Sequence, residues 1–193
     1  MNPLPEYLFP VHPRWCELIT EGKKTVEVRK RVPKQVPFVG YIYCTKPKYP
    51  HEDFLAVNAG TPDAFCYYAG GKVIGEFLCK EVFDLWPGYT GNRGDTCMTF
   101  DQEEQYLGTN GHGYGIVMSD VKIYREPIGL ENFRKPCIMN EMPYCPSCPK
   151  GYVYISEDEA AFPNDAGGQM TEWHCLNHLN KAPQMWCRVK RHI

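Results

Sequence analysis

The stretch GKKTVEVRK, residues 22–30, carries most of what the sequence predicts about fold and site. A Gly-Lys-Lys turn runs into an alternation of β-branched and charged residues, which is typical of a β-strand. Because side chains two apart in a strand share a face, we expect Glu27 and Arg29 to point the same way. Gly22 permits a sharp turn that would bring Lys24 to the start of that face.

The segments around this stretch predict a small α+β domain. Each is assigned from its apolar periodicity and from the Gly and Pro residues that bound it. We expect a helix over 13–21, strands over 40–45 and 72–86, a helix over 99–108 with Asp101 as a candidate N-cap, and a strand pair or one bent strand over 113–128. Residues 46–71 are expected to form an irregular excursion with room for a short helix.

Several strands with one or two helices favour a small mixed barrel or half-barrel, with helices at its side or mouth. The composition changes near residue 130, after which Cys, Pro, Asn and acidic residues dominate. We therefore predict two units, a barrel domain over 1–130 and a cysteine-rich unit over 131–193.

The overall composition constrains partners and location. The chain has 193 residues, 43% hydrophobic and 23% charged, with a formal net charge of −2. This charge balance excludes a protein whose whole surface is basic and binds nucleic acid, so any anion-binding surface must be local. No run of 18 apolar residues predicts a membrane span, and the first residues lack a secretory signal pattern. We expect a cytoplasmic protein, in which clustered cysteines serve metal binding better than disulfides.

The ten cysteines divide into two groups. Five stand alone among apolar or mixed neighbours and are expected to be small buried hydrophobes. These are Cys16, Cys44, Cys66, Cys79 and Cys97. The other five crowd the last third of the chain, where apolar content is thin.

Within that last third, Cys145 and Cys148 form a C-P-S-C knuckle, and Cys175 and Cys187 follow. Two thiolates from a knuckle and two from a distant pair can occupy the corners of a tetrahedron around Zn²⁺. Such a site releases about 10–16 kcal/mol and can replace a hydrophobic core in a short, zinc-ribbon-like segment. His174, His178 or Cys137 remain alternatives for one ligand, and a redox pair or free thiols are the alternatives to zinc.

The charged stretch is a candidate ligand site. If Lys24, Glu27 and Arg29 line a cleft beneath the helix, Glu76 of a later strand could join them there. Arg clamps phosphate or carboxylate or stacks on a base, Lys supplies a point charge or a base, and Glu accepts from an exocyclic amine. The plainer alternative is a Glu27–Arg29 salt bridge on a solvated face.

A local basic patch adds to this interpretation. Lysines and arginines outnumber acids between residues 23 and 48, and Tyr41, Tyr43 and Tyr49 are interleaved with them. Lys30 and Arg31 would form a rim that attracts phosphate. Basic groups near aromatic side chains are the footprint of nucleic-acid binding, although a solvated face with core tyrosines gives the same pattern.

These residues resemble a known family. YLFPVHPRWCELITEGKKTVEVRKRVPK, residues 7–34, resembles the start of the ASCH domain, a PUA-like β-barrel, whose Gly-x-Lys-x-x-Glu-x-Arg signature falls on Gly22, Lys24, Glu27 and Arg29. The following GYIYCT and GKVIGEF are also similar to that family, and the resemblance covers about residues 6–127, apart from 46–71. The ending APQMWCRV resembles the cysteine-rich tail of phage and prophage members, which implies Cys187 rather than His192 as the last zinc ligand.

The resemblance implies a barrel with a cleft that binds RNA or modified nucleobases. One branch of relatives consists of N4-acylcytidine amidohydrolases that use a lysine, a threonine and a later glutamate. Lys24 and Glu76 match two of those positions, but Glu27 stands at the threonine position, and Thr25 should face the other way. Another relative is a metal-dependent ribonuclease, for which Glu27 and Glu76 could hold an ion.

Three hypotheses follow. The first is a binding module for RNA, a nucleotide or a modified base, using Lys24, Glu27, Arg29 and Glu76. The second is a hydrolase of the ASCH type with Lys24, Glu27 and Glu76 as catalytic residues. The third is a phage factor that binds a protein partner. A nucleic-acid ligand predicts strong salt dependence, whereas an apolar protein interface does not.

Overall fold

The structure, a computed structural model, describes most of the chain up to residue 134 and parts of the remainder. The described residues are 4–49, 54–58, 62–89, 91, 93–109, 111–134, 153–154, 173–174 and 185–191. They contain the helices α1 (Pro13–Thr20) and α2 (Phe100–Leu107) and a 3₁₀ turn, η2 (Leu130–Asn132). Neither helix has the length or the apolar content needed to cross a membrane, and this holds for the described residues alone.

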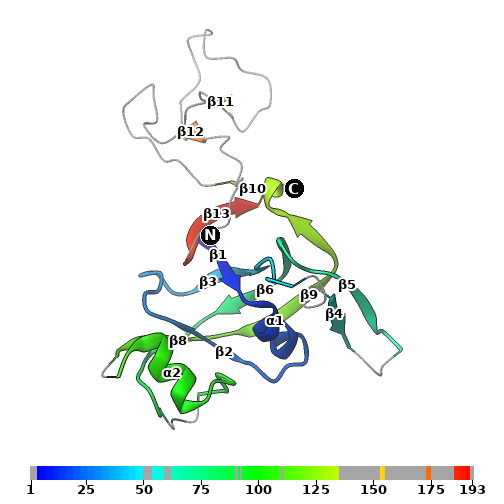
Figure 1. The fold of residues 1–193 in the computed structure, drawn as a ribbon. Coiled ribbons are helices and arrows are strands. Elements are labelled where there is room, and N and C mark those ends of the chain that lie inside the picture. The colour runs from blue at the N-terminus through cyan, green and yellow to red at the C-terminus, as the bar shows by residue number, and fades with distance from the viewer. Residues whose placement is uncertain are drawn as a thin grey trace.

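A six-stranded mixed sheet forms the body of the molecule (Figure 1). Its strands in spatial order are β10 (Phe133–Arg134), β13 (Cys187–Arg191), β1 (Glu6–Val11), β3 (Phe38–Cys44), β6 (Lys72–Cys79) and β9 (Ser119–Gly129). Strands β1 and β3 run parallel, and the other neighbours are antiparallel. The chain segment between them holds α1, as a parallel crossover requires.

Three smaller sets of paired strands accompany this sheet. The first is a three-stranded antiparallel sheet, and the other two are two-stranded. They are β2 (Val26–Arg29), β8 (Gly113–Val117) and β7 (Val82–Leu85) in the order β2-β8-β7, then β4 (Phe54–Val57) with β5 (Phe65–Tyr68), and β11 (Val153–Tyr154) with β12 (Trp173–His174). The three-stranded sheet and α2 lie at the end of the main sheet away from β13 (Figure 1).

The chain passes between the two larger sheets four times, and the passage from β6 to β7 corrects an expectation. Residues 72–86 are not one strand, because a break at residues 80–81 separates β6 from β7. The expectation of a strand pair or one bent strand over 113–128 is met in part: β8 and β9 are two strands but belong to different sheets. They divide at Met118, whose N–H donates to the Thr25 carbonyl 2.9 Å away. The two larger sheets are therefore separate in their pairing among the described residues, and no closed barrel is formed there, whereas the sequence suggested a barrel or half-barrel.

The described residues of the excursion over 46–71 also differ from the expectation, because they form the hairpin β4–β5 and contain no helix. Leu55 and Val57 turn inward and join the core beside α1. The Thr20 hydroxyl of α1 donates to the Ala56 carbonyl at 3.5 Å. Burial alternates along β4, with Leu55 and Val57 buried and Phe54 and Ala56 exposed, which is the pattern of a strand pair with one face on the core.

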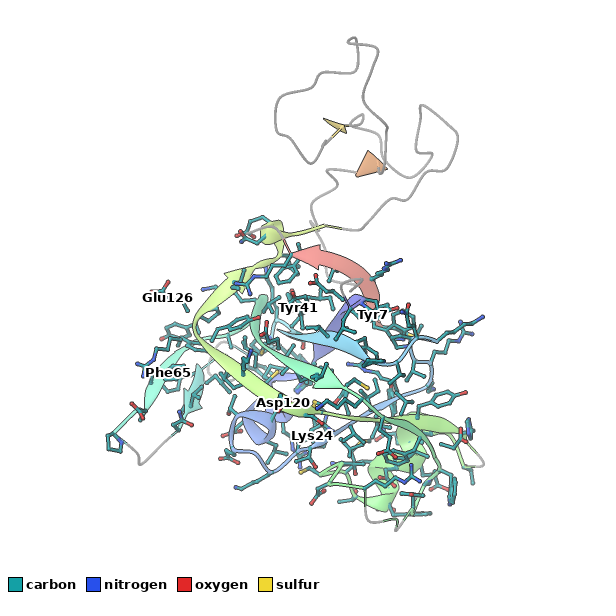
Figure 2. The ribbon with its side chains drawn as sticks, turned by 180° about the vertical axis from the view of Figure 1, so that it is seen from behind. Tyr7, Lys24, Tyr41, Phe65, Asp120 and Glu126 are labelled. Atoms are coloured by element: carbon teal, nitrogen blue, oxygen red, sulfur yellow. The ribbon has the colours of Figure 1, made fainter. Side chains whose placement is uncertain are left out.

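Alternation along the strands builds a core on each face of the main sheet. Phe9 and Ile42 pack on the side covered by α1. Leu8 and Tyr41 pack on the opposite side, together with Phe133 and Val189. A third cluster lies between the three-stranded sheet and α2 and contains Val26, Val28, Phe83, Leu85 and Leu107. Figure 2 shows these side chains, with Tyr7 and Tyr41 labelled near β13.

The isolated cysteines follow their expectation in part. Cys16, Cys44 and Cys79 are fully buried. Cys66 is exposed, because it occupies the outer face of β5, and Cys97 is half-buried in a loop with φ of 56°. Apolar neighbours in the sequence do not ensure that a side chain is buried. One face of the β4–β5 hairpin remains in water, and Cys66 lies on that face.

The predicted division at residue 130 is modified by two strands. β10 and β13 pair with each other and extend the main sheet at β1, with Leu8 opposite Cys187. These two strands of the predicted second unit thus pair within the main sheet, and the division into two units stays a prediction. The rest of that unit lies largely outside the described residues, so its own fold stays a prediction.

Candidate functional site

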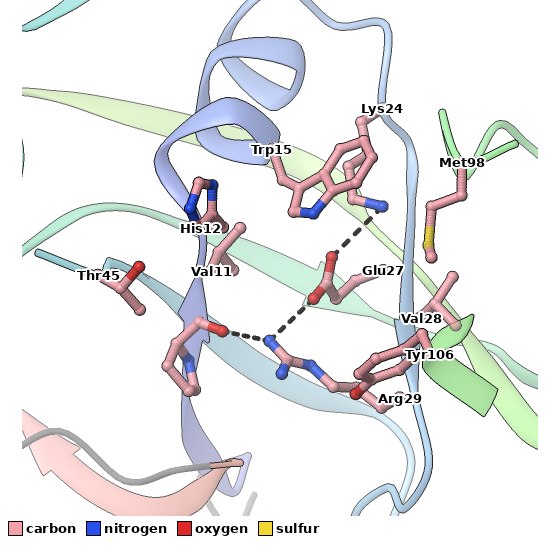
Figure 3. Close-up of a pocket in the computed structure, with 11 residues that line it drawn as sticks. Val11, His12, Trp15, Lys24, Glu27, Val28, Arg29, Thr45, Met98 and Tyr106 are labelled. Carbon is pink, nitrogen blue, oxygen red and sulfur yellow. Dashed lines mark hydrogen bonds and ion pairs between the residues drawn. The ribbon is translucent and has the colours of Figure 1, made fainter. Parts of the chain in front are cut away.

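A pocket of about 370 Å³ opens where α1, β1, β2 and α2 meet (Figure 3). It falls within the size range of small-molecule sites in proteins. Its walls come from five separate parts of the chain. They consist of Pro10, Val11, His12, Trp15, Lys24, Glu27, Val28, Arg29, Thr45, Met98 and Tyr106.

Lys24 reaches this pocket through the turn that ends α1. Gly22 adopts φ of 70°, and the Lys24 N–H bonds to the Leu18 carbonyl, which reverses the chain into β2. The Lys24 side chain is 1% exposed. Its ammonium donates to the carbonyl of Val26 at 2.8 Å and to that of Thr96 at 2.7 Å. Burial of this charge is tolerated because each donor faces an oxygen.

Glu27 joins the two cations of the pocket. Its Oε2 lies 3.4 Å from the Lys24 ammonium, and its Oε1 lies 2.8 Å from Nη2 of Arg29. The two strand neighbours meet because residues two apart on β2 share a face, while Val26 and Val28 turn toward α2. Glu27 is 6% exposed and Arg29 is 8% exposed, so this is a buried ion pair and not the surface pair considered above.

Not all N–H donors of Arg29 are used within the described residues. Its Nη2 donates to the Pro10 carbonyl of β1 in addition to Glu27. Its Nε is buried and has no hydrogen-bond partner among the described residues. Its guanidinium lies 6.0 Å from the centre of the Phe9 ring. A buried donor without a partner is costly, so a ligand or a water that supplies an acceptor here would be favoured.

Aromatic side chains form part of the remaining wall. The Lys24 ammonium lies 5.1 Å from the centre of the Trp15 ring, and the Lys30 ammonium lies 5.5 Å from that of Tyr106. Both distances are within the range of cation–π attraction. Sequence reasoning missed the pocket roles of Trp15 and Tyr106, since each is one apolar position of an amphipathic helix. It also missed His12, Thr45 and Met98, for which no local pattern gave a signal.

Glu76 is not brought to this pocket, which corrects the expectation that it would join the other three. Its Oε2 accepts from the Tyr124 hydroxyl at 2.7 Å, and its carboxylate lies near Lys122 and Arg191. Glu76 lies on the sheet face where Tyr41, Tyr124 and Phe133 pack. The register shifts around Gly75 leave Glu76 opposite Tyr41, whereas α1 covers the other face.

The basic rim is present at the surface. Lys30 and Arg31 follow Arg29 directly and are both exposed. The Trp186 indole N–H donates to the Arg31 carbonyl at 2.7 Å, so the segment before β13 contacts the same loop. Lys30 lies beside a pocket residue, Tyr106, whereas Arg31 is not one of the residues that line the pocket.

Buried thiols next to the pocket are poor nucleophiles. Burial raises the pKa of the Cys16 thiol well above its usual value, and the neighbouring Cys44 thiol and the Glu27 carboxylate add to the rise. Cys16 donates to the Val11 carbonyl at 3.7 Å. A thiol that stays protonated is unreactive, so covalent catalysis by Cys16 is not supported.

The proposed zinc ligands are mostly not described. Cys145, Cys148 and Cys175 lie outside the described residues, together with Cys137 and His178. Cys187 begins β13 and is partly buried against the cluster around Leu8. The described residues contain no group of three or more His, Cys, Asp or Glu that could hold a metal. The donor chemistry of four thiolates fits zinc, and the site itself stays a prediction.

The contacts of Lys24 and Thr25 limit what these two side chains can do in the pocket. The three donors of Lys24 all face acceptors, which holds its ammonium in place. The Thr25 hydroxyl accepts from the Asp95 N–H at 2.9 Å, and Thr25 does not line the pocket. Glu27 retains acceptor capacity, because each carboxylate oxygen can accept more than one hydrogen bond.

Comparison with known proteins finds likenesses among solved structures only. No protein-family model and no curated protein matches the sequence. The ASCH protein from Zymomonas mobilis is 20% identical over 65% of this chain and 73% of that chain, with a TM-score of 0.48. Two point mutants of the same protein give 19% and 20% identity, cover 65% and 67% of this chain and 76% and 78% of theirs, and have TM-scores of 0.48 and 0.47. At this level of likeness, function must be argued from the pocket.

Proposed function

We propose that the protein binds a nucleobase, free or within RNA, in the pocket around Glu27. The observation that carries the proposal is a buried carboxylate, held by two buried cations, in a pocket that also presents aromatic rings. Bases offer a flat π-face for Trp15 or Tyr106 and an edge with amino donors for Glu27. The basic rim at Lys30 and Arg31 suits the phosphates of a nucleotide or RNA.

The pocket supports a small ligand rather than a duplex. Its volume of about 370 Å³ accommodates a single base with part of its sugar. A duplex base cannot enter such a site, so the base would come from a single strand, where bases can be splayed out and stacked on aromatic residues. A modified base could be recognised in the same way, because its substituent changes the pattern of hydrogen-bond donors and acceptors on the base edge.

Identification of bound nucleic acid tests the proposal. The protein is purified at low salt, and co-purifying RNA and nucleosides are identified by crosslinking and mass spectrometry. Nucleosides are then titrated into wild type and Glu27→Gln, with Glu81→Gln as the control because Glu81 forms an exposed ion pair with Arg93. We expect only Glu27→Gln to lose affinity. Equal affinity in both variants would refute the assignment of the pocket.

The same titrations separate binding from turnover. A hydrolase of the ASCH type would convert an acylated nucleoside or RNA to product, whereas a binding module returns its ligand unchanged. The ordered, fully bonded ammonium of Lys24 supports binding. Product formation that disappears with Lys24→Met would establish the hydrolase instead.

We also propose a structural zinc ion bound by Cys145, Cys148, Cys175 and Cys187. The C-P-S-C spacing of the first two cysteines supports this proposal. With four protein ligands the ion has no open position, so it would organise the region before β13 rather than act on the ligand. Metal content, followed in a Cys145→Ser variant, tests this.

A further inference from the structure

All four buried charged residues among those described lie around one site. They are Lys24, Glu27, Arg29 and Glu103, each 8% exposed or less. The first three form the ion pairs of the pocket, whereas Glu103 comes from α2 and does not line it. Burial of an ionised carboxylate is expensive unless donors or cations compensate it, so the position of Glu103 requires an explanation.

Glu103 is joined to Lys24 through one residue. Its Oε1 accepts from the Thr96 hydroxyl at 3.1 Å, and the Thr96 carbonyl accepts from the Lys24 ammonium at 2.7 Å. Its Oε2 accepts from the Gly88 N–H at 3.0 Å. Both oxygens therefore receive neutral donors, and among the described residues no ion pair joins this carboxylate to a cation. Lys24, one residue further, is the nearest buried cation along this chain of bonds.

The loop that contains Thr96 is fastened to the start of β2. The Thr25 and Val26 N–H groups both donate to the Asp95 carbonyl at 3.0 Å, and the Thr25 hydroxyl accepts from the Asp95 N–H. The Thr96 hydroxyl also accepts from the Met98 N–H at 3.2 Å. Because Met98 lines the pocket, the bond from Glu103 fixes one wall of the pocket together with the partner of Lys24.

Charge balance gives Glu103 a second role. Lys24 and Arg29 carry two positive charges, and Glu27 carries one negative charge, which leaves an excess of one positive charge in the buried triad. Glu103 supplies the missing negative charge. Buried charges interact strongly because the surroundings polarise little, so this carboxylate offsets the potential that the triad creates in the pocket.

We propose that Glu103 is a positioning residue of the pocket, which holds Lys24 in place through Thr96 and neutralises the buried Lys24–Glu27–Arg29 triad. A consequence is that the pocket admits an uncharged edge of its ligand and disfavours a small anion. The proposal concerns the pocket named in the proposed function but is tested without a nucleobase, so either can fail while the other stands.

The test compares Glu103→Gln with Glu104→Gln, which removes the same charge from the next residue of α2. The first readout is the hydrogen-exchange rate of the Lys24 ammonium, followed by NMR of ¹⁵N-lysine-labelled protein. We expect Glu103→Gln to raise it by about tenfold, which corresponds to about 1.4 kcal/mol, and Glu104→Gln to leave it unchanged. A purely structural carboxylate would lower the melting temperature without moving this rate at temperatures where the protein is folded.

The second readout is the affinity for inorganic phosphate. Glu103→Gln leaves the triad with its excess positive charge, so we expect phosphate binding about tenfold stronger than in wild type and in Glu104→Gln. The double variant Glu103→Gln with Lys24→Met restores neutrality and should return phosphate affinity to that of the wild type. An equal phosphate affinity in Glu103→Gln and Glu104→Gln would overturn the charge role.

Two further variants separate position from charge and replace Glu103→Gln if it does not fold. Thr96→Val removes the hydroxyl that links the two residues, and Glu103→Asp keeps the charge but shortens the reach. Both should speed Lys24 exchange, and neither should strengthen phosphate binding. Unchanged exchange in Thr96→Val would contradict the link from Glu103 to Lys24.

Discussion

Replacement of Glu27 by Gln is the most direct perturbation of the pocket. The substitution keeps the shape of the side chain but leaves Lys24 and Arg29 buried without their shared counter-charge. The two contacts are 3.4 Å and 2.8 Å long. At an effective dielectric constant of about 20, each is worth about 5–6 kcal/mol before the desolvation of the carboxylate is subtracted. We expect a net loss of about 3–5 kcal/mol, as for other buried pairs that lose one partner.

The assay is unfolding in urea, followed by tryptophan fluorescence and circular dichroism, with thermal unfolding alongside. For a chain of this size, a loss of 1 kcal/mol lowers the melting temperature by about 2–4 °C, so Glu27→Gln should lower it by about 6–20 °C. Glu81→Gln is the matched control, because its partner Arg93 and Glu81 itself are about half exposed. An exposed pair contributes at most about 1 kcal/mol.

The comparison between the two variants decides the outcome. If Glu27→Gln loses no more stability than Glu81→Gln, the carboxylate is not buried between the two cations, and the pocket described above is wrong. If Glu27→Gln is strongly destabilised, substitution of Arg29 by Met in the same background should recover part of the loss, because it removes one of the unpaired charges.

Three other predictions concern groups away from the pocket. Burial raises the pKa of Cys79 to about 11, so alkylation at pH 8, mapped by mass spectrometry, should modify the exposed Cys66 well before Cys79; equal rates would contradict the buried position. Burial and, after it, the hydrogen bond to Glu76 raise the pKa of Tyr124. The folded state therefore favours the protonated phenol, and the stability that Tyr124 contributes is complete below the usual tyrosine pKa of about 10. This stability is lost at higher pH, as the phenol of the folded protein ionises. Tyr124→Phe should therefore show a smaller fall in melting temperature between pH 9 and 11 than the wild type, and an identical fall would exclude Tyr124 as its cause. Metal analysis should find zinc in the wild type and less in Cys145→Ser, and zinc-free wild-type protein with reduced thiols would refute the metal site.

Local pattern predicted the helix α1 and the strand β2 well. The helix begins at Pro13 and ends at Thr20, against an expected 13–21. For α2 the segment was right but the cap was not, because the Thr99 side chain, and not that of Asp101, accepts from the Gln102 N–H. Such features depend on residues within a few positions of one another, which is why the sequence alone suffices for them.

Long-range features were beyond the same reasoning. Glu76 was expected beside Lys24, yet two register shifts in the pairing of β6 with β9 place it with Tyr124 on the other sheet face. A shift of one residue exchanges the two faces of a strand, and nothing local signals where it occurs. No sequence pattern indicated a role for Glu103 at the pocket either, since an acidic residue in the first turn of a helix is ordinarily explained by its interaction with the helix dipole.

The sequence by itself determined that Glu27 and Arg29 share a face and that Lys24 follows a turn, because strand periodicity and a glycine with positive φ are local properties. Only the tertiary structure decided that these charges are buried, that Trp15 and Tyr106 stand beside them, and that Glu103 balances them. Burial and charge balance depend on which distant segments pack together, and that packing is a property of the whole fold.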